Sequence, residues 1–148
     1  MALGATTYKT PNIINKIGQD LTSKEGCGVY LLGANVVELA STAQAPPYAV
    51  IVTGTDSLTP GTYPSAIGDA SLEMVDQLGC VVQVLISTAA GVVAGDFLLI
   101  DNTDADGTFT SVSNQPAVAV DFVWGMALTD ANASEQCLMR FQPYLQQV

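Results

Sequence analysis

The chain has 148 residues, of which 49% are hydrophobic and 12% charged, and 14 acidic residues against four basic ones give it a net charge of −10. This length suits one domain that buries roughly 70% of the surface of its unfolded chain. The negative charge disfavours contact with a phosphate backbone, and the absence of histidine removes the usual general base and metal ligand. We therefore expect no enzymatic activity, no metal, no other cofactor and no nucleic-acid partner.

The first segment, residues 1–24, differs from the rest in charge and pattern. It holds three of the four basic residues against one aspartate, whereas Arg140 alone faces thirteen acids in residues 25–148. It mixes Pro11 and Gly18 with several Asn and Thr residues and shows no clear periodicity. We predict an extended N-terminal arm over residues 1–24 and a β-rich domain over residues 25–148.

Two interpretations of this arm remain open. It can be a plain solvated terminus, which is common in proteins. It can also become ordered when it docks on another protein, with isoleucines as anchors and lysines facing an acidic neighbour. The residues of this second interpretation are Lys9, Ile13, Ile14, Lys16 and Ile17.

After residue 25 the pattern is that of short β-strands. Seven runs are rich in Val, Ile, Leu, Thr and aromatic residues and are bounded by Gly, Pro, Asn or Asp. They are residues 27–32, 48–53, 81–87, 97–101, 108–112, 118–128 and 136–141. We expect a small antiparallel sandwich or barrel with at most one or two short helices. Runs such as VVQVLIS and FVWGMAL are apolar on both faces, which is typical of central strands or of a face buried against a partner.

Residues 44–64, between the first strands, are rich in proline and tyrosine. The four prolines and two tyrosines surround a single strand, which suggests rigid loops with amphipathic rings at their tips. Such loops can form a binding surface, but they are also ordinary loop chemistry. Further on, residues 71–78 fit a short helix with Ser71 as its N-cap and Gly79 just past its end, or equally a strand.

The three cysteines, Cys27, Cys80 and Cys137, each lie in an apolar stretch and far from one another in the sequence. An odd number without close spacing indicates buried thiols rather than a disulfide framework. Trp124 lies within an apolar run and is expected in the core.

Two Gly and Asp segments invite ligand hypotheses. Asn102, Asp104, Asp106 and Gly107 match the start of a calcium loop, but the twelfth position is Ser113 instead of glutamate. An acidic hairpin turn, with Asp106 and Gly107 at positive φ, explains them as well. Residues 91–96, GVVAGD, lack the GK[ST] of a phosphate loop, and we predict a tight turn whose aspartate accepts hydrogen bonds from backbone amides.

The N-terminal residues lack the apolar core that would indicate a signal peptide. The longest apolar stretch, residues 117–128, is shorter than the roughly 20 residues that cross a bilayer. We expect no membrane partner.

The order of the C-terminal pieces resembles that of phage head decoration proteins, also called capsid cement proteins. In that family a Gly-Asp turn leads into an apolar strand, an Asp-Gly hairpin follows, and a strand ending in a Gly-hydrophobic-Ala-Leu stretch precedes a last strand of mixed polarity. The matching positions here are Gly95 and Asp96, Asp106 and Gly107, residues 125–128 and residues 135–141. Each piece is short, and the match covers roughly the last 70 residues.

The resemblance implies a structural virion protein on the outer surface of a phage capsid, made in the host cytoplasm. Members of the family form homotrimers at three-fold and quasi-three-fold positions, and their N-terminal segment reaches onto the major capsid protein. The alternative from another class is a carbohydrate- or receptor-binding β module of a tail fibre or adhesin, which would use residues 44–64 for contact.

Overall fold

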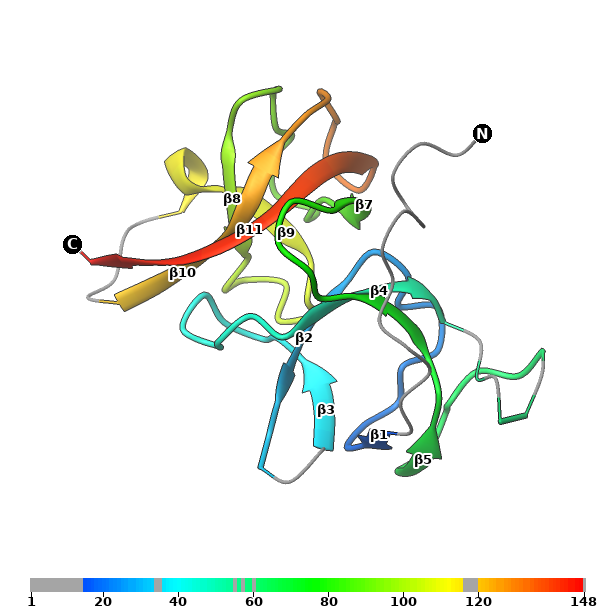
Figure 1. Cartoon of the computed structure of the whole chain (residues 1–148). Coiled ribbons are helices and arrows are strands. Elements are labelled where there is room, and N and C mark those ends of the chain that lie inside the picture. The colour runs from blue at the N-terminus through cyan, green and yellow to red at the C-terminus, as the bar shows by residue number, and fades with distance from the viewer. Residues whose placement is uncertain are drawn as a thin grey trace.

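The computed structural model describes residues 15–33, 36–54, 56, 58–59, 61–115 and 120–147. Within these ranges the chain forms eleven strands and one short 3-10 helix, Val112–Asn114. The strands make two sheets that occupy the two halves of the molecule (Figure 1). The predicted β-rich, mainly antiparallel fold is confirmed.

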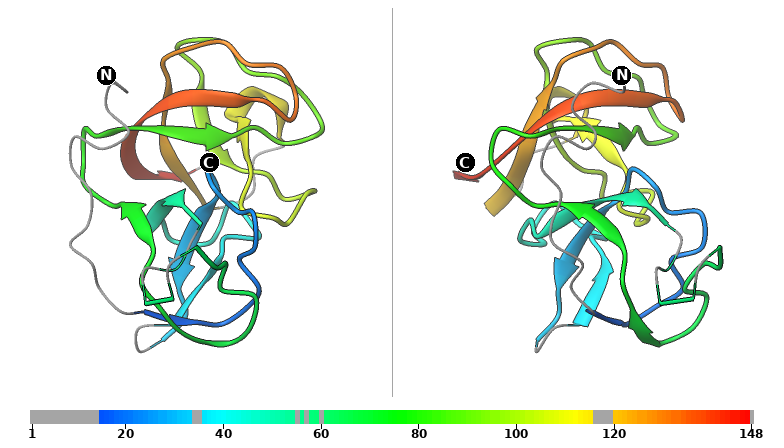
Figure 2. Two further views of the ribbon diagram at one scale, coloured as in Figure 1. Left: turned by 90° about the vertical axis from the view of Figure 1, so that its right-hand side faces the viewer. Right: turned by 45° about the vertical axis from the view of Figure 1, so that its right-hand side comes forward.

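The first sheet has six strands in the order β5-β1-β3-β2-β4-β6. Its strands are β1 (Asn15–Ile17), β2 (Gly28–Leu31), β3 (Val36–Leu39), β4 (Ala49–Thr53), β5 (Gly68–Ala70) and β6 (Glu73–Val75). Every pairing in it is antiparallel except that of β1 with β3. The β2–β3 hairpin extends away from the second sheet, as two further views show (Figure 2).

The second sheet has five strands in the order β7-β11-β10-β8-β9, all antiparallel to their neighbours. They are β7 (Val81–Leu85), β8 (Phe97–Ile100), β9 (Phe109–Ser111), β10 (Val120–Ala127) and β11 (Gln136–Gln147). A parallel bridge between Ile86 and Phe109 joins the two edges of this sheet, and the Ser87 N–H donates to the Phe109 carbonyl oxygen over 2.8 Å. The second sheet therefore curls into a small, nearly closed barrel.

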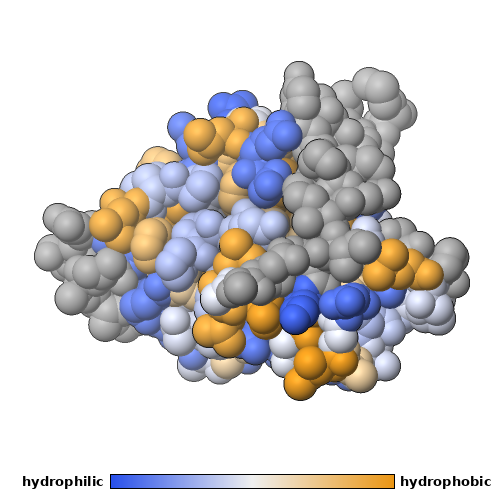
Figure 3. Space-filling view, turned by 60° about the horizontal axis from the view of Figure 1, so that its bottom comes forward, coloured by the Kyte–Doolittle hydropathy of each residue, from blue (hydrophilic) through white to orange (hydrophobic). Residues whose placement is uncertain are grey.

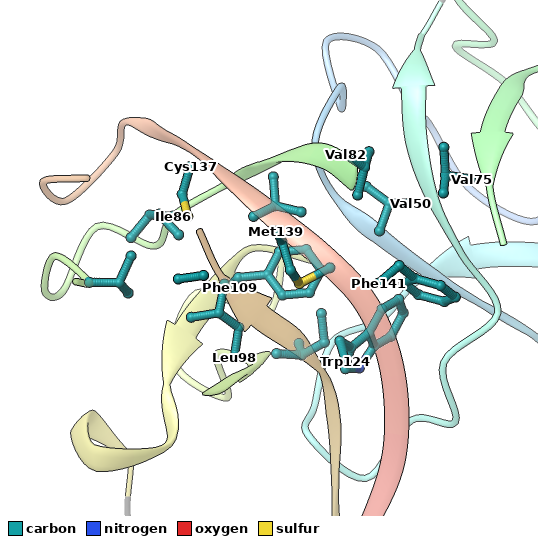
Figure 4. Close-up of a cluster of buried hydrophobic side chains, with 14 of the residues drawn as sticks. Val50, Val75, Val82, Ile86, Leu98, Phe109, Trp124, Cys137, Met139 and Phe141 are labelled. Carbon is teal, nitrogen blue, oxygen red and sulfur yellow. The ribbon is translucent and has the colours of Figure 1, made fainter. Parts of the chain in front are cut away.

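Three aromatic rings form the centre of the core inside this barrel. Trp124 is fully buried and lies edge-on to Phe109, with ring centroids 5.5 Å apart, and to Phe141 at 6.3 Å. Val50 and Val75 of the first sheet belong to the same cluster and close its open side (Figure 4). The expectation that Trp124 lies in the core is confirmed.

A β-bulge in β10 turns Trp124 inward. Val123 pairs with Leu99, but the next paired residue, Gly125, faces Leu98, so that Trp124 is an extra residue in this strand. Trp124 and Gly125 therefore both face the core. A Cβ atom at Gly125 would collide with the carbonyl oxygen of Arg140, so this position has no room for a side chain.

The opposite face of the first sheet buries a second apolar cluster, to which the start of the chain contributes. Ile17 is 1% exposed and Leu21 is fully buried. β1 is paired on both sides, with β3 and with β5. Residues 15–24 therefore belong to the folded domain and not to an arm, which corrects the predicted boundary at residue 24.

All seven predicted strands are present, with somewhat different ends, and three further strands, β1, β3 and β5, were not predicted. Of the two interpretations of residues 71–78, the strand is right, because Glu73–Val75 pairs with β4. The helix is wrong: the segment supplies Leu72, Met74 and Val75 to the two clusters in an extended conformation.

Two glycines join the sheets at the point where the β8–β9 hairpin reaches the first sheet. The Gly28 N–H donates to the Gly107 carbonyl oxygen over 2.8 Å. A Cβ on Gly28 would lie 2.9 Å from both Trp124 and Ile100, and a Cβ on Gly107 would lie 2.7 Å from the Gly28 oxygen. Next to this contact, Lys24 pairs with Asp106 at 3.3 Å. The contact between the sheets thus depends on the absence of a side chain at Gly28 and at Gly107.

We predict that Gly107→Ala destabilises the protein much more than Gly79→Ala. Both glycines have positive φ, +74° and +84°, so both substitutions place a side chain in the left-handed region, which costs about 1–2 kcal/mol of strain. Only at position 107 does the new methyl group meet backbone atoms, and this clash adds about 1–3 kcal/mol to the loss of stability. Urea denaturation at constant m would measure the difference, and equal losses would contradict the proposed junction.

Candidate functional surfaces

The described residues contain no metal-binding group of three or more cysteines, aspartates and glutamates. None of the helices within them is long and apolar enough to span a bilayer.

The acidic loop between β8 and β9 fastens three other parts of the chain. Asn102 Oδ1 accepts from the Ala43 N–H at 2.8 Å, and the two Asp104 oxygens accept from the N–H and hydroxyl of Thr88, each at 2.8 Å. Asp106 pairs with Lys24. The oxygens that a calcium loop would direct to one ion thus point to different partners. The hairpin interpretation fits, although positive φ falls on Ala105 and Gly107 and not on Asp106.

Asp101, at the start of this loop, is a buried carboxylate held ionised by donors. Burial raises its pKa, but hydrogen bonds from the hydroxyl and backbone of Thr103 and from the backbone of Asp104 outweigh that effect and leave the pKa below the ordinary value of 3.8. The residue is 2% exposed. Its carboxylate therefore stabilises the loop in its charged form.

The tight turn predicted over residues 91–96 is confirmed. The Asp96 carboxylate accepts from the Val93 N–H at 3.0 Å, and the Asp96 N–H donates to the Val93 carbonyl oxygen. Gly95 adopts a φ of +97°. The turn packs beside residues 130–135, where Asp130 accepts from the Ala94 N–H. These acids organise loops.

The predicted arm residues fall into three groups. Lys9, Ile13 and Ile14 lie outside the described residues. Lys16 is exposed on β1. Ile17 is in the core of its own subunit, so the prediction that it contacts a partner is wrong. The burial of Ile17 could not be predicted, because a strand of three residues is too short to show an alternating pattern.

Large apolar side chains remain exposed at several places. Figure 3 shows apolar residues in several separate groups on the face it presents, with polar residues between them. Over the whole surface of the described residues, the exposed large apolar side chains are Leu31, Leu32, Leu58, Tyr63, Ile67, Leu78, Val93, Phe97, Tyr144 and Leu145. Among them, Phe97 and Tyr144 touch each other edge to face, with centroids 6.1 Å apart. Tyr63 is the exposed member of the tyrosine loops considered for ligand binding, whereas Tyr48 is partly buried.

A shallow hollow of about 450 Å³ lies between the β8–β9 loop and the segment after β9. Its polar lining is made of amide, hydroxyl and carboxylate side chains. Several of these are engaged with backbone: the Gln115 side chain accepts from the Asn102 N–H and donates to the Ile100 carbonyl oxygen, and Asn114 donates to the Gly91 carbonyl oxygen. This hollow was not predicted from the sequence.

No family model matches the chain, and no curated protein matches it.

We predict that the three cysteines resist alkylation in the folded protein. All three are free and buried, as expected from the sequence. Burial raises the pKa of Cys27 to about 12 and raises those of Cys80 and Cys137. Because the thiolate is the reactive form, iodoacetamide at pH 8 should modify none of them natively and all three in urea. Mass spectrometry measures this, and rapid native modification would contradict it.

We also predict a pH-dependent effect of Asp101→Asn. The folded pKa of Asp101 lies below 3.8, so its contribution is fully present above the unfolded pKa and is lost as pH falls through the folded value. The stability gap between wild type and variant should be largest near pH 6 and shrink below about pH 3.8. Asn114→Ala, which removes a non-titrating side chain of the same hollow, should show a constant gap. Urea midpoints from pH 7 to pH 2 would test this, and a gap independent of pH for both variants would contradict it.

Proposed function

We propose that the protein is a structural virion protein that binds the outer surface of a phage capsid as a decoration or cement protein and acts as a homotrimer. One observation carries the proposal. The four pieces that resemble decoration proteins fall on neighbouring parts of one sheet: the turn before β8, the β8–β9 hairpin, the end of β10 and the start of β11. Pieces that are weak singly thus belong to one structural unit.

The architecture is compatible with such a role. Cementing a shell needs complementary surface, and many copies on a lattice convert weak contacts into strong attachment. The barrel is tied internally by hydrogen bonds between loops, such as those of Asp104 with Thr88, which keep its contact surfaces in a fixed shape. A strong negative charge limits unwanted association with other copies and with packaged DNA.

The proposed contact with the major capsid protein uses the start of the chain. Lys16 is exposed on β1, and Lys9, Ile13 and Ile14 precede that strand. Since Ile17 and Leu21 are core residues, a deletion through residue 24 would remove part of the fold. The useful truncation removes residues 1–14 and keeps β1.

We predict that the full-length protein binds saturably to particles of its phage and that the version lacking residues 1–14 binds at least about tenfold more weakly. Because avidity multiplies each lost contact, the deficit should be larger on intact shells than on isolated capsid protein. Sedimentation of particles with labelled protein measures it. Equal urea midpoints show that the truncated domain is folded, and no binding by the full-length chain would overturn the proposal.

The alternative function, a carbohydrate- or receptor-binding module, is favoured by the hollow beside the β8–β9 loop. Its polar lining is Asp101, Asn102, Thr103, Thr110, Asn114 and Gln115. Amides, hydroxyls and a carboxylate are groups that can hydrogen-bond to sugar hydroxyls. A glycan array with the same labelled protein separates the functions: binding to glycans without binding to particles would favour the alternative.

A further inference from the structure

The outward face of the second sheet carries a row of side chains that crosses four strands. Phe97 of β8 pairs with Met126 of β10, Met126 pairs with Arg140 of β11, and Arg140 pairs with Val81 of β7. Residues directly opposite one another in a sheet share a face. Their neighbours along the strands, Leu98 and Met139 among them, are buried in the barrel. The row therefore points away from the core.

Tyr144 extends this surface along β11. It pairs with Val123, which pairs with Leu99, so Tyr144 stands in the adjacent row on the same face. Val123 and Leu99 are buried within the subunit, and Tyr144 is the member of this row that reaches solvent. Its ring contacts Phe97 edge to face. Even so, Phe97 is 48% and Tyr144 44% exposed, so much of both rings still faces solvent. We call Val81, Phe97, Met126, Arg140 and Tyr144 the Phe97 face.

The composition of the Phe97 face is unusual for this chain. Thirteen acidic residues follow Lys24, yet none of the five members of the face is acidic, and the face holds the only arginine. Aromatic residues, methionine and arginine are enriched in the buried centres of protein interfaces, whereas Asp, Glu and Lys are depleted there. The Phe97 face has the residue types of an interface centre.

We propose that the Phe97 face docks against a second copy of this chain. Two chains of charge −10 repel each other, so a close approach is easiest where at least one of the two contact surfaces carries no carboxylate. A basic partner would be attracted instead to the acidic loops. Arg140 also supplies hydrogen-bond donors that a carboxylate-rich copy can accept. The inference deepens the proposed function, because it locates the homotrimer contact, but it does not need the capsid.

Self-association of the full-length protein tests the inference. Sedimentation equilibrium up to about 100 µM covers the micromolar range in which weak interfaces of ordinary size dissociate. The double variant Phe97→Ser, Tyr144→Ser should raise the dissociation constant at least about 30-fold, the loss expected when hot-spot side chains are removed. Ile67→Ser is the matched control, because Ile67 is 79% exposed beside the first sheet. It should leave association unchanged.

Charge gives a second, independent readout. Arg140→Glu should weaken association more than Arg140→Gln, because it adds a repelling charge to the interface. Association of wild type should strengthen between low and high salt, because screening reduces the repulsion between two acidic chains. Equal urea midpoints for all variants would show that the domain is folded; these side chains are exposed, so we expect no unfolding.

Three results would overturn the inference: a wild-type monomer at the highest concentration, unchanged association in the double variant, or an equal loss in Ile67→Ser. The capsid proposal fails separately. An oligomer disrupted by the double variant, together with no binding to particles, would refute the capsid role and keep the Phe97 face. Saturable binding to particles by a wild-type monomer would keep the capsid role and refute the Phe97 face as a contact between copies.

Discussion

The fold depends on the contact of one tryptophan with one glycine. Trp124 fills the centre of the barrel, and the space where Gly28 would carry a side chain is occupied by the Trp124 ring and Ile100. Gly28 belongs to β2 of the first sheet, so this contact fixes the distance between the sheets. The bulge in β10 is what makes it possible, because a regular strand would not turn both Trp124 and Gly125 to the same side. The Phe97 face follows from the same bulge: Met126, two residues after Trp124, again points outward in register with Phe97 and Arg140.

Much of the β-structure could be predicted because its strands are long or strongly apolar. β7 and β10 appear in the sequence as largely apolar runs, each with a single polar residue, Gln83 and Asp121, and the Asp-Gly turn marks the β8–β9 hairpin. β1 could not be predicted in this way, because it has three residues, one of which is an exposed lysine. Its place in the sheet comes from pairing with β3 and with the distant β5, and pairing partners far along the chain leave no local signal. Lysine content therefore suggested an arm where the chain in fact enters the sheet.

The candidate functional surfaces were predicted less well than the fold. The acidic residues that resembled ligand sites hold the chain itself in place: Asp104 joins its loop to Thr88, and Asp96 accepts from the Val93 N–H within its own turn. Whether a carboxylate binds an ion or a neighbouring amide depends on which backbone groups the fold brings near, and these come from distant segments. The Phe97 face was equally hidden, because its five members come from four strands and become neighbours only through the register of the sheet. The apolar runs predicted either central strands or a face buried against a partner, but the outward side of these strands was not identifiable from the sequence.

The position of β1 inside the sheet determines how the domain would respond to tension. β1 is bonded to β3 in parallel on one side and to β5 in antiparallel on the other, instead of lying at an edge. A force applied to Asn15 from its N-terminal side therefore loads two rows of hydrogen bonds at once. The packing of Ile17 in the second cluster also resists it. An edge strand would detach one bond at a time from a single neighbour. A tether attached before β1 would thus be mechanically anchored in the interior of the domain.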